Sequence, residues 1–390
     1  MALYYNAVKP LNIRPFYDAN SIVDFTIKLR PGRAVKAGSL RVSGWLNVQK
    51  QKPNTTTWVP LVKDDCVFVD PFAGVHSFFR NSNCSVNDRT IESNSCYPRF
   101  ASMTKQAKYT LEGINTGSLA SVELCGTQNN ILLMGSEIAA NTPVFSPPTT
   151  GATYSIPFSF IPEVALNKCG QDLGQSRFPQ MKLLFNLASP LECLFSTAKL
   201  EYIADEISSL RYQFLDLQLD WYETIEVPSS LPITFQTATL ITQTLQSSAN
   251  TFAVNSPTIY DAISLTFIKQ SHRNKLQFNN LACEWVPGLE NVGSSVEAQV
   301  SGNDQPIRFK IEQYSELALN YHRSLSGQVK NMLMNTWLSQ NGTFGIGYKF
   351  TTAINDRLSI NVILNGLAAE ENPSQAPSDC FIFVNGYLSV

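Results

Sequence analysis

The sequence is poor in charged side chains. Charged residues make up 15% of the 390 residues, against about 25% in an average soluble domain. Ser, Thr, Asn and Gln are abundant in their place. Because surface charge keeps copies of a protein apart, a chain with so little of it is suited to burying its surface against neighbours. Many β-rich proteins also carry abundant Ser and Thr, so composition alone leaves both explanations open.

Motifs that carry catalysis or hold cofactors are absent as well. Neither a G-x-x-x-x-G-K-[ST] phosphate loop nor a G-x-G-x-x-G dinucleotide loop occurs. The three histidines are His76, His272 and His322, and none lies in a G-x-S-x-G nucleophile turn. We therefore predict that the chain is not an enzyme and that it has no catalytic residues, no cofactor-binding residues and no cofactor.

The eight cysteines do not form a metal-binding or disulfide pattern. None is part of a C-x-x-C pair, and with three histidines no zinc-ligand spacing arises. We therefore predict no metal site and expect mostly reduced, buried thiols, as in a protein that folds in a cytosol.

Long apolar segments are also missing. The N-terminus has no apolar signal-peptide core, and no run of about 18 apolar residues occurs. The sequence therefore predicts a protein that is neither secreted by a standard signal nor membrane-spanning.

Charge is distributed unevenly along the chain. Residues 1–50 contain eight basic and two acidic side chains, a net +6, so the overall charge of −2 leaves −8 for the remainder. A basic N-terminal segment is suited to facing anionic lipid headgroups or nucleic acid. Alternatively, these side chains lie on the wet face of a strand.

Alternation of apolar and polar residues dominates the pattern. Val23, Phe25, Ile27 and Leu29 alternate with polar side chains, which predicts a strand with one face on a core. Clusters of Gly, Pro and Asn separate such runs. The other runs of this kind are 40–48, 154–160, 215–222, 344–350 and 360–364.

Signals for helices are few. Asp70 followed by Pro71 predicts the start of a short helix, with Asp70 as N-cap and Pro71 at the first helical position. Residues 314–338 form the longest helix-compatible stretch. Many strands with scattered short helices favour β-sandwiches over any α/β fold.

Two prolines and two serines between 228 and 232 divide the chain into two parts. We predict an N-terminal arm at 1–20, a first β-sandwich at 21–227, a linker at 228–232 and a second β-sandwich at 233–390.

Three segments of the first part are similar to segments of the second, in the same order, which indicates a duplicated unit. They are a strand with Ile-Glu before a helical turn, a later apolar strand and a closing strand. The pairs are 90–93 with 310–313, 181–188 with 358–365, and 214–224 with 380–390.

At this point the chain resembles the double jelly-roll major capsid proteins of the adenovirus–tectivirus lineage. Residues 70–92, 160–168 with 187–190, and 215–222 carry the resemblance. It covers nearly the whole chain, although no single motif is diagnostic. The predicted fold class is all-β with a few short helices, arranged as two tandem jelly-roll β-sandwiches.

The resemblance implies a structural role. Three copies would form a pseudo-hexameric homotrimer, and such trimers would tile an icosahedral virus shell after folding in the host cytosol or nucleus. Implied partners are further copies of the chain, penton and minor capsid proteins and an internal lipid membrane, without sequence-specific nucleic acid. Arm 1–20 would face inward, with Lys9 and Arg14 contacting a membrane or minor proteins, and loops 113–153 and 288–304 would face outward.

Two other functions remain open from the sequence. A secreted two-sandwich glycan-processing enzyme would need two carboxylates across a cleft. A viral spike or receptor-binding β-sandwich would need exposed aromatic side chains, and only Trp58 and Trp285 are tryptophans in loop-like contexts. The acidic pairs available to an enzyme are Asp64-Asp65, Asp205-Glu206 and Glu370-Glu371.

Overall fold

The computed structural model divides the chain into two compact units. Unit 1 comprises Met1–Ser102, Leu111–Ile233 and Asn274–Asn280, and unit 2 comprises Met103–Thr110, Thr234–Arg273 and Leu281–Val390. The residues that the structure describes are 3–51, 55–61, 65–109, 111–127, 155–196, 210–245, 249–254, 259–279, 281, 295–301, 307–311, 314–326, 345–354, 358–365 and 378–390.

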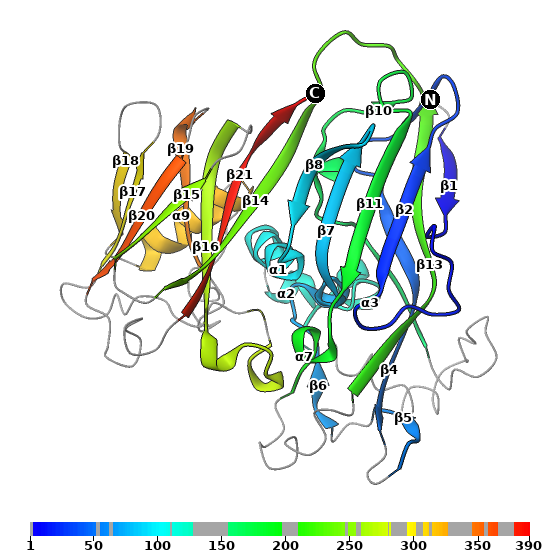
Figure 1. Ribbon diagram of the computed structural model, residues 1–390, viewed down its shortest axis with the longest axis horizontal. Coiled ribbons are helices and arrows are strands. Elements are labelled where there is room, and N and C mark those ends of the chain that lie inside the picture. Colours follow the sequence, from blue (N-terminus) through cyan, green and yellow to red (C-terminus); the bar gives the residue numbers. More distant parts are fainter. Residues whose placement is uncertain are drawn as a thin grey trace. The chain divides into compact units, whose positions relative to one another are not determined.

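One sheet of unit 1 contains four strands in the order β2-β11-β7-β8, which lie side by side in Figure 1. Alternation is clearest in β11, where every second side chain is buried, because successive side chains of a strand point to opposite faces. The strands are β2 (Ile22–Lys28), β7 (Phe79–Val86), β8 (Arg89–Asn94) and β11 (Gln180–Leu187).

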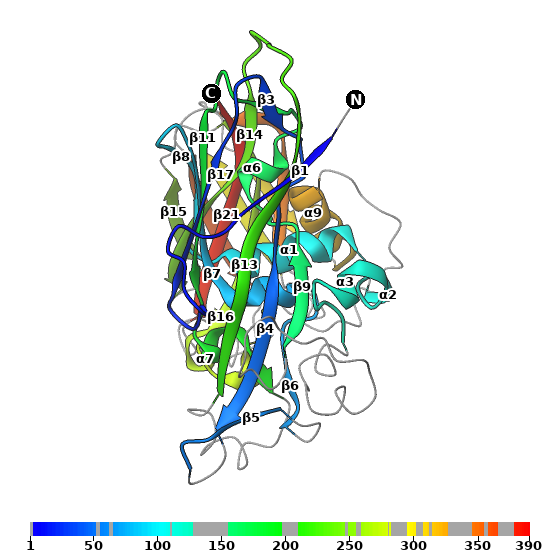
Figure 2. The same ribbon diagram turned by 90° about the vertical axis from the view of Figure 1, so that its right-hand side faces the viewer.

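The second sheet of unit 1 is built around the long strand β13 (Leu210–Ile225). Figure 2 shows β13, β4 and β9 side by side. The order is β10-β3-β13-β4-β5, with β1 also on β13 and β9 also on β4. The other strands are β1 (Tyr4–Val8), β3 (Arg33–Val35), β4 (Arg41–Gln51), β5 (Trp58–Pro60), β9 (Ile156–Phe160) and β10 (Leu173–Gly174). A separate pair joins β6 (Val67–Phe68) and β12 (Phe195–Ser196).

Aromatic side chains from both sheets form the core of unit 1. The ring of Phe79, on β7, lies 4.9 Å from that of Phe185, on β11 in the same sheet. It also lies 5.0 Å from Phe160 and 5.4 Å from Phe214, on the other sheet. Rings at such distances pack favourably beyond the area they bury, so this cluster holds the two sheets together.

Unit 2 contains two antiparallel sheets of four strands each, ordered β14-β21-β16-β19 and β15-β20-β17-β18. Strand β14 pairs with β21 along its full length, from Thr234 with Ser389 to Leu245 with Ser378. The strands are β14 (Thr234–Leu245), β15 (Ala249–Val254), β16 (Ile259–Lys269), β17 (Ser295–Ser301), β18 (Ile307–Ile311), β19 (Ile346–Ile354), β20 (Leu358–Asn365) and β21 (Ser378–Ser389).

The two units share one pairing scheme. Numbered along the chain, the eight main strands of unit 1 are β1, β2, β4, β7, β8, β9, β11 and β13, and those of unit 2 are β14 to β21. In both units the first strand pairs with the eighth, the second with the seventh, the third with the sixth and the fourth with the fifth. The third also pairs with the eighth, and the fourth with the seventh. Such nested pairing of eight antiparallel strands in two sheets is a jelly roll.

The segments predicted to be equivalent occupy equivalent strands. Each closing strand, β13 or β21, is the eighth of its unit, and each apolar strand, β11 or β20, is the seventh. The fifth strand of each unit, β8 or β18, leads into a helix: α1 (Tyr97–Lys108) or α9 (Tyr314–Ser326). The remainder of the predicted 314–338 helix lies outside the described residues. The predicted fold class, two tandem jelly-roll sandwiches, is confirmed.

The predicted N-terminal arm needs correction. Residues 4–8 form β1, the first strand of the first jelly roll, and pair with residues 219–223 of β13. Tyr17 then bridges to Phe214 of the same strand. The sequence Tyr-Tyr-Asn-Ala-Val does not alternate, and none of its side chains is buried, so the pattern gave no strand signal. Most of 1–20 therefore belongs to unit 1.

The predicted domain boundaries, which divide the chain into continuous ranges, also assign two segments to the wrong unit. The division of the chain falls between Ile233 and Thr234, directly after the predicted linker 228–232, but 103–110 group with unit 2 and 274–280 with unit 1. Of the predicted outward loops, 113–153 and 288–304, the described parts form α2 (Leu111–Ile114), α3 (Gly117–Ser121) and β17. The rest of both loops lies outside the described residues.

The predicted helix at Asp70 is a turn followed by a 3-10 helix, η2 (Gly74–Phe78). Asp70 does cap it locally, because Oδ1 accepts hydrogen bonds from the backbone N–H groups of Phe72 (3.0 Å) and Ala73 (2.6 Å). Gly74 interrupts a continuous α-helix because its φ is +55°, a conformation that favours glycine. Within the described parts of the chain, no helix is long and apolar enough to cross a membrane.

Candidate functional site

The two residues predicted to make contacts, Lys9 and Arg14, lie in a loop that interrupts the first strand. Val8 pairs with Leu219, and the next pairing along β13 joins Tyr17 to Phe214. Residues 9–16 therefore lie opposite only residues 215–218. Eight residues against four cannot stay in register, so the longer side leaves the sheet as a loop.

Lys9 is held at the start of this loop by an ion pair. Its Nζ lies 3.3 Å from Oδ1 of Asp216, and both side chains are substantially exposed. An exposed pair of this kind contributes about 0–1 kcal/mol. Asp216 has a φ of +48°, and the ion pair lies where the register between β13 and β4 shifts, between Leu215 and Gln218. The charge of Lys9 is thus partly matched within unit 1 and is not a free cation.

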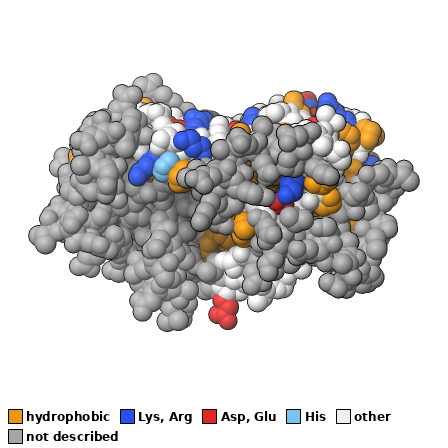
Figure 3. All heavy atoms as spheres, turned by 90° about the horizontal axis from the view of Figure 1, so that it is seen from below, with side chains coloured by type: hydrophobic (Ala, Val, Ile, Leu, Met, Phe, Trp, Pro, Cys, Tyr) orange, Lys and Arg blue, Asp and Glu red, His pale blue; other side chains and the backbone are white. Residues whose placement is uncertain are grey.

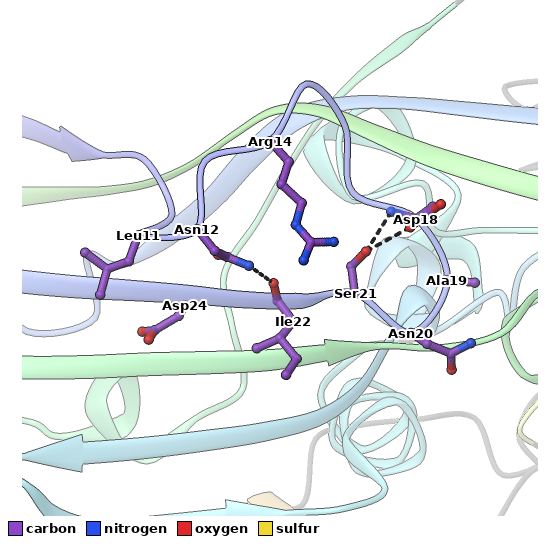
Figure 4. A pocket seen from close by; sticks show the side chains of 9 residues that line it. All are labelled: Leu11, Asn12, Arg14, Asp18, Ala19, Asn20, Ser21, Ile22 and Asp24. Atoms are coloured by element: carbon purple, nitrogen blue, oxygen red, sulfur yellow. Dashed lines mark hydrogen bonds between the residues drawn. The ribbon is translucent and has the colours of Figure 1, made fainter.

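Arg14 lines an open hollow of about 450 Å³ between the loop and the start of β2. Figure 4 shows its side chain reaching from the loop toward Ser21 and Ile22. Ser21 Oγ donates a hydrogen bond to Asp18 Oδ1 at 2.9 Å, and Asp24 also lines the hollow. The wall therefore carries charges of both signs, unlike the mostly apolar, enclosed pockets that bind small ligands.

Buried titratable side chains gather beneath η2. Asp70 is 2% exposed, and Ser102 Oγ donates a hydrogen bond of 2.8 Å to its Oδ1. Burial raises the pKa of Asp70 to about 6, against the opposing effects of its hydrogen bonds and of the positive charge of Arg99. Desolvation is the dominant cause because it penalises the charged form.

His76 lies in the same region and is fully buried. Its Nδ1 lies 2.7 Å from the Tyr97 hydroxyl, and its Nε2 lies 3.7 Å from Oε2 of Glu123. Burial raises the pKa of Tyr97 well above its usual value, and the Tyr97 oxygen accepts a hydrogen bond from the backbone of Glu163. A histidine without solvent access has no route to a substrate, so this cluster connects η2, α1 and the Glu163 segment.

The remaining candidates for an enzymatic site are not assembled into one. His322 is buried on α9, where desolvation lowers its pKa, and His272 lies in a separate 3-10 turn. Asp65 is buried and paired with Lys50 at 2.5 Å. Among the residues that the structure places, no group of three or more His, Cys, Asp or Glu side chains is arranged to hold a metal. The members of the acidic pairs other than Asp65 lie outside the described residues.

The aromatic candidate for a sugar platform, Trp58, is half-buried, and one face of its ring is occupied. The guanidinium of Arg211 lies 4.3 Å above the ring of Trp58 and occupies one face of it, as in a cation–π contact. Trp285 lies outside the described residues. Figure 3 shows basic, acidic and hydrophobic side chains interspersed on the face in view, without a broad patch of one kind among the coloured residues.

Solved structures resemble the chain along its whole length. The cryo-EM structure of the Sputnik virophage is 12% identical with a TM-score of 0.56, covering 100% of this chain and 86% of that one. VP54 of PBCV-1, fitted into a reconstruction of Sputnik, is 9% identical with a TM-score of 0.55, covering 100% and 95%. The Faustovirus major capsid protein is 9% identical with a TM-score of 0.54, covering 100% and 90%.

The chain has the double jelly-roll fold. Two independent observations agree on this point: the pairing scheme that eight strands of each unit share and the full-length likeness to these structures. Identities of 9–12% concern the fold and not single side chains. No family model and no curated protein matches the sequence.

Sequence reasoning located Lys9 and Arg14 from charge alone but missed their setting. The ion pair of Lys9 joins residues 207 positions apart, which no local pattern reveals. The sequence did contain one signal that marks this segment as a surface, namely the density of large apolar residues between 3 and 16.

Proposed function

We propose that the chain is the major structural subunit of an icosahedral virus shell. The observation that carries this proposal is that one chain contains two jelly rolls whose eight main strands pair in the same way. Three such chains supply six similar rolls and thus a pseudo-hexameric homotrimer, a block that tiles a surface. The likeness to the Faustovirus major capsid protein supports the same role.

The composition supports self-association as well. With 15% charged residues, the chain carries little of the surface charge that keeps soluble monomers apart. In this proposal the chain is located in the capsid of the virion, where it contacts further copies of itself. Penton proteins, minor capsid proteins and an underlying lipid membrane are the additional partners, and folding takes place in the host cytosol or nucleus.

Thiol chemistry agrees with folding in a reducing compartment. Cys84, Cys169 and Cys193 are buried and free, and burial raises the pKa of each thiol. Thiols of raised pKa carry little thiolate and react slowly with oxidants. These three side chains therefore act as small apolar core residues.

The test is the mass of the purified chain in solution. We expect native mass spectrometry and light scattering to give three times the 43.3 kDa chain mass. A stable monomer at high protein concentration would overturn the proposal. Electron microscopy of particles separates this role from that of a spike, since a shell subunit covers every facet and a spike occurs only at vertices.

A further inference from the structure

The first strand of unit 1 is poorly covered: Asn6 and Val8 are half-buried, and Tyr4, Tyr5 and Ala7 are exposed. None of the five side chains of β1 is buried, whereas its counterpart β14 buries Phe235, Ala238 and Leu245. Ordering a residue costs about 1–2 kcal/mol of backbone entropy, and burial of apolar side chains normally offsets this cost. In the single chain β1 has little of that compensation, so a covering surface would stabilise it.

Large apolar side chains are concentrated on β1 and the loop after it. We call residues 3–16 the β1 strip. Ile13 is 76% exposed, Leu11 is 62% exposed and Tyr5 is 60% exposed. Six of the fourteen exposed large hydrophobic side chains of the described residues lie in the strip: Leu3, Tyr4, Tyr5, Leu11, Ile13 and Phe16.

The exposed apolar area of the strip is sufficient for a specific protein interface. At up to about 200 Å² for each large side chain, the six expose roughly 600 Å². A standard interface buries about 800 Å² on each partner, of which about 57% is apolar. Apolar patches of this size on monomeric proteins are often functional.

The charges in and around the strip identify the kind of partner. Lys9 is paired with Asp216, Arg14 shares its hollow with Asp18 and Asp24, and the guanidinium of Arg33 lies 4.3 Å from the ring centre of Tyr4. An anionic lipid surface attracts clusters of basic side chains, and this balance of signs offers no such cluster. A surface with both signs in similar number matches another copy of itself, because each charge can meet its opposite.

We propose that the β1 strip is an interface with a second copy of this chain, and that the contact keeps the strip ordered. The proposal rests on the function inferred above, because shell assembly supplies the second copy. It adds the location of one contact and revises the predicted role of Lys9 and Arg14. They border a contact between copies and do not anchor the protein to lipid.

The test compares Ile13→Asp with Ile161→Asp in the purified chain. Ile13 is 76% exposed, so its replacement spares the core, and Ile161, which is 40% exposed, is a control isoleucine of unit 1 outside the strip. We expect Ile13→Asp to raise the concentration needed for self-association about tenfold or more, which corresponds to about 1.4 kcal/mol. Ile161→Asp should associate like the wild type. Equal association of all three proteins, or equal loss in both variants, would overturn the proposal.

Hydrogen exchange gives a second readout. Amides of residues 3–16 should exchange more slowly in the associated wild-type protein than in its separated chains, while the Ile13→Asp chain should keep the fast rates. Unchanged exchange of the strip on association would overturn the inference and leave the shell function standing. A wild-type chain that never associates would instead refute the shell function and the contact together.

Vesicles of phosphatidylcholine and phosphatidylserine test the lipid alternative. The proposal expects the wild-type chain and the Ile13→Asp variant to sediment equally little with such vesicles. Binding by the wild type that Ile13→Asp abolishes, with association unchanged, would overturn the proposal in favour of a membrane contact.

Discussion

Replacement of Asp70 by asparagine tests whether this buried carboxyl makes unit 1 sensitive to pH. The pKa of Asp70 in the folded chain is about 6, whereas an aspartate in an unfolded chain has a pKa of about 3.9. The folded state therefore binds the proton more tightly than the unfolded state. Below about pH 4 Asp70 is protonated in both states and does not reduce the unfolding free energy. As the pH rises from about 4 through about 6, the unfolding free energy falls, because the folded state holds the proton and the unfolded state releases it.

The size of the effect follows from the shift. Two pKa units correspond to about 3 kcal/mol, nearly all of it expressed at pH 7. The substituted asparagine would keep an oxygen that accepts from Phe72, Ala73 and Ser102 but has no charge to desolvate. Relative to wild type, Asp70→Asn should therefore gain about 2 kcal/mol of unfolding free energy between pH 4 and pH 7.

Urea unfolding followed by tryptophan fluorescence at about pH 4, 5, 6 and 7 measures this difference across the window that the shift defines. Asp88→Asn is the control for loss of one carboxylate, because Asp88 is exposed and paired with Lys182, and it should change stability by less than about 1 kcal/mol. A difference between wild type and Asp70→Asn that stays constant over this pH range would refute the reasoning.

Two further substitutions test the core of each unit. At Gly347 an added Cβ would clash with Ser324 and lie 2.8 Å from Cα of Tyr321, so Gly347→Val should displace α9. We expect this variant to lower the unfolding free energy by about 2 kcal/mol and to speed hydrogen exchange of residues 314–326. Unchanged exchange there would contradict this close packing. Phe79→Ala removes the ring that packs against both sheets of unit 1, so we expect urea unfolding to show an unfolding free energy lower by about 3–5 kcal/mol. Phe79→Leu should lower it less. Equal losses in the two variants would contradict the contribution of the aromatic ring.

Some of the strands that the sequence predicted have one buried face and one more exposed face. In β9 every second side chain of residues 156–160 is buried, as the alternation at 154–160 predicted, so the chemical alternation reports the structure directly. β13 was likewise predicted at 215–222, although the strand extends from 210 to 225. Where one side of a strand packs on a core, local pattern was sufficient.

Helix α1 shows the opposite case. Its residues 97–107 are all buried, including Arg99, Lys105 and Gln106. A helix that is buried all round has no amphipathic stripe, and polar residues within it resemble a loop. The sequence therefore predicted one helical turn where the structure has a helix of 12 residues.

The neighbours of Lys9 and Arg14 could not be predicted from the sequence, because contacts between distant parts of the chain create them. The basic character of residues 1–50 was visible in the composition, and it suggested an inward-facing arm. Pairing of residues 4–8 with 219–223 brings Asp216 to Lys9, and the fold alone creates this proximity. Counting charges along a chain cannot show which of them are matched in space.

The nested pairing also sets the order in which the protein can fold during synthesis. Tyr4 finds its partner only at Glu223, and Thr234 finds its partner only at Ser389. At about 5–20 residues per second, β1 would wait roughly 10–40 s for β13 to be made. Contacts so distant in sequence make folding slow, so each roll stays open, with its apolar faces accessible to chaperones, until its last strand closes it.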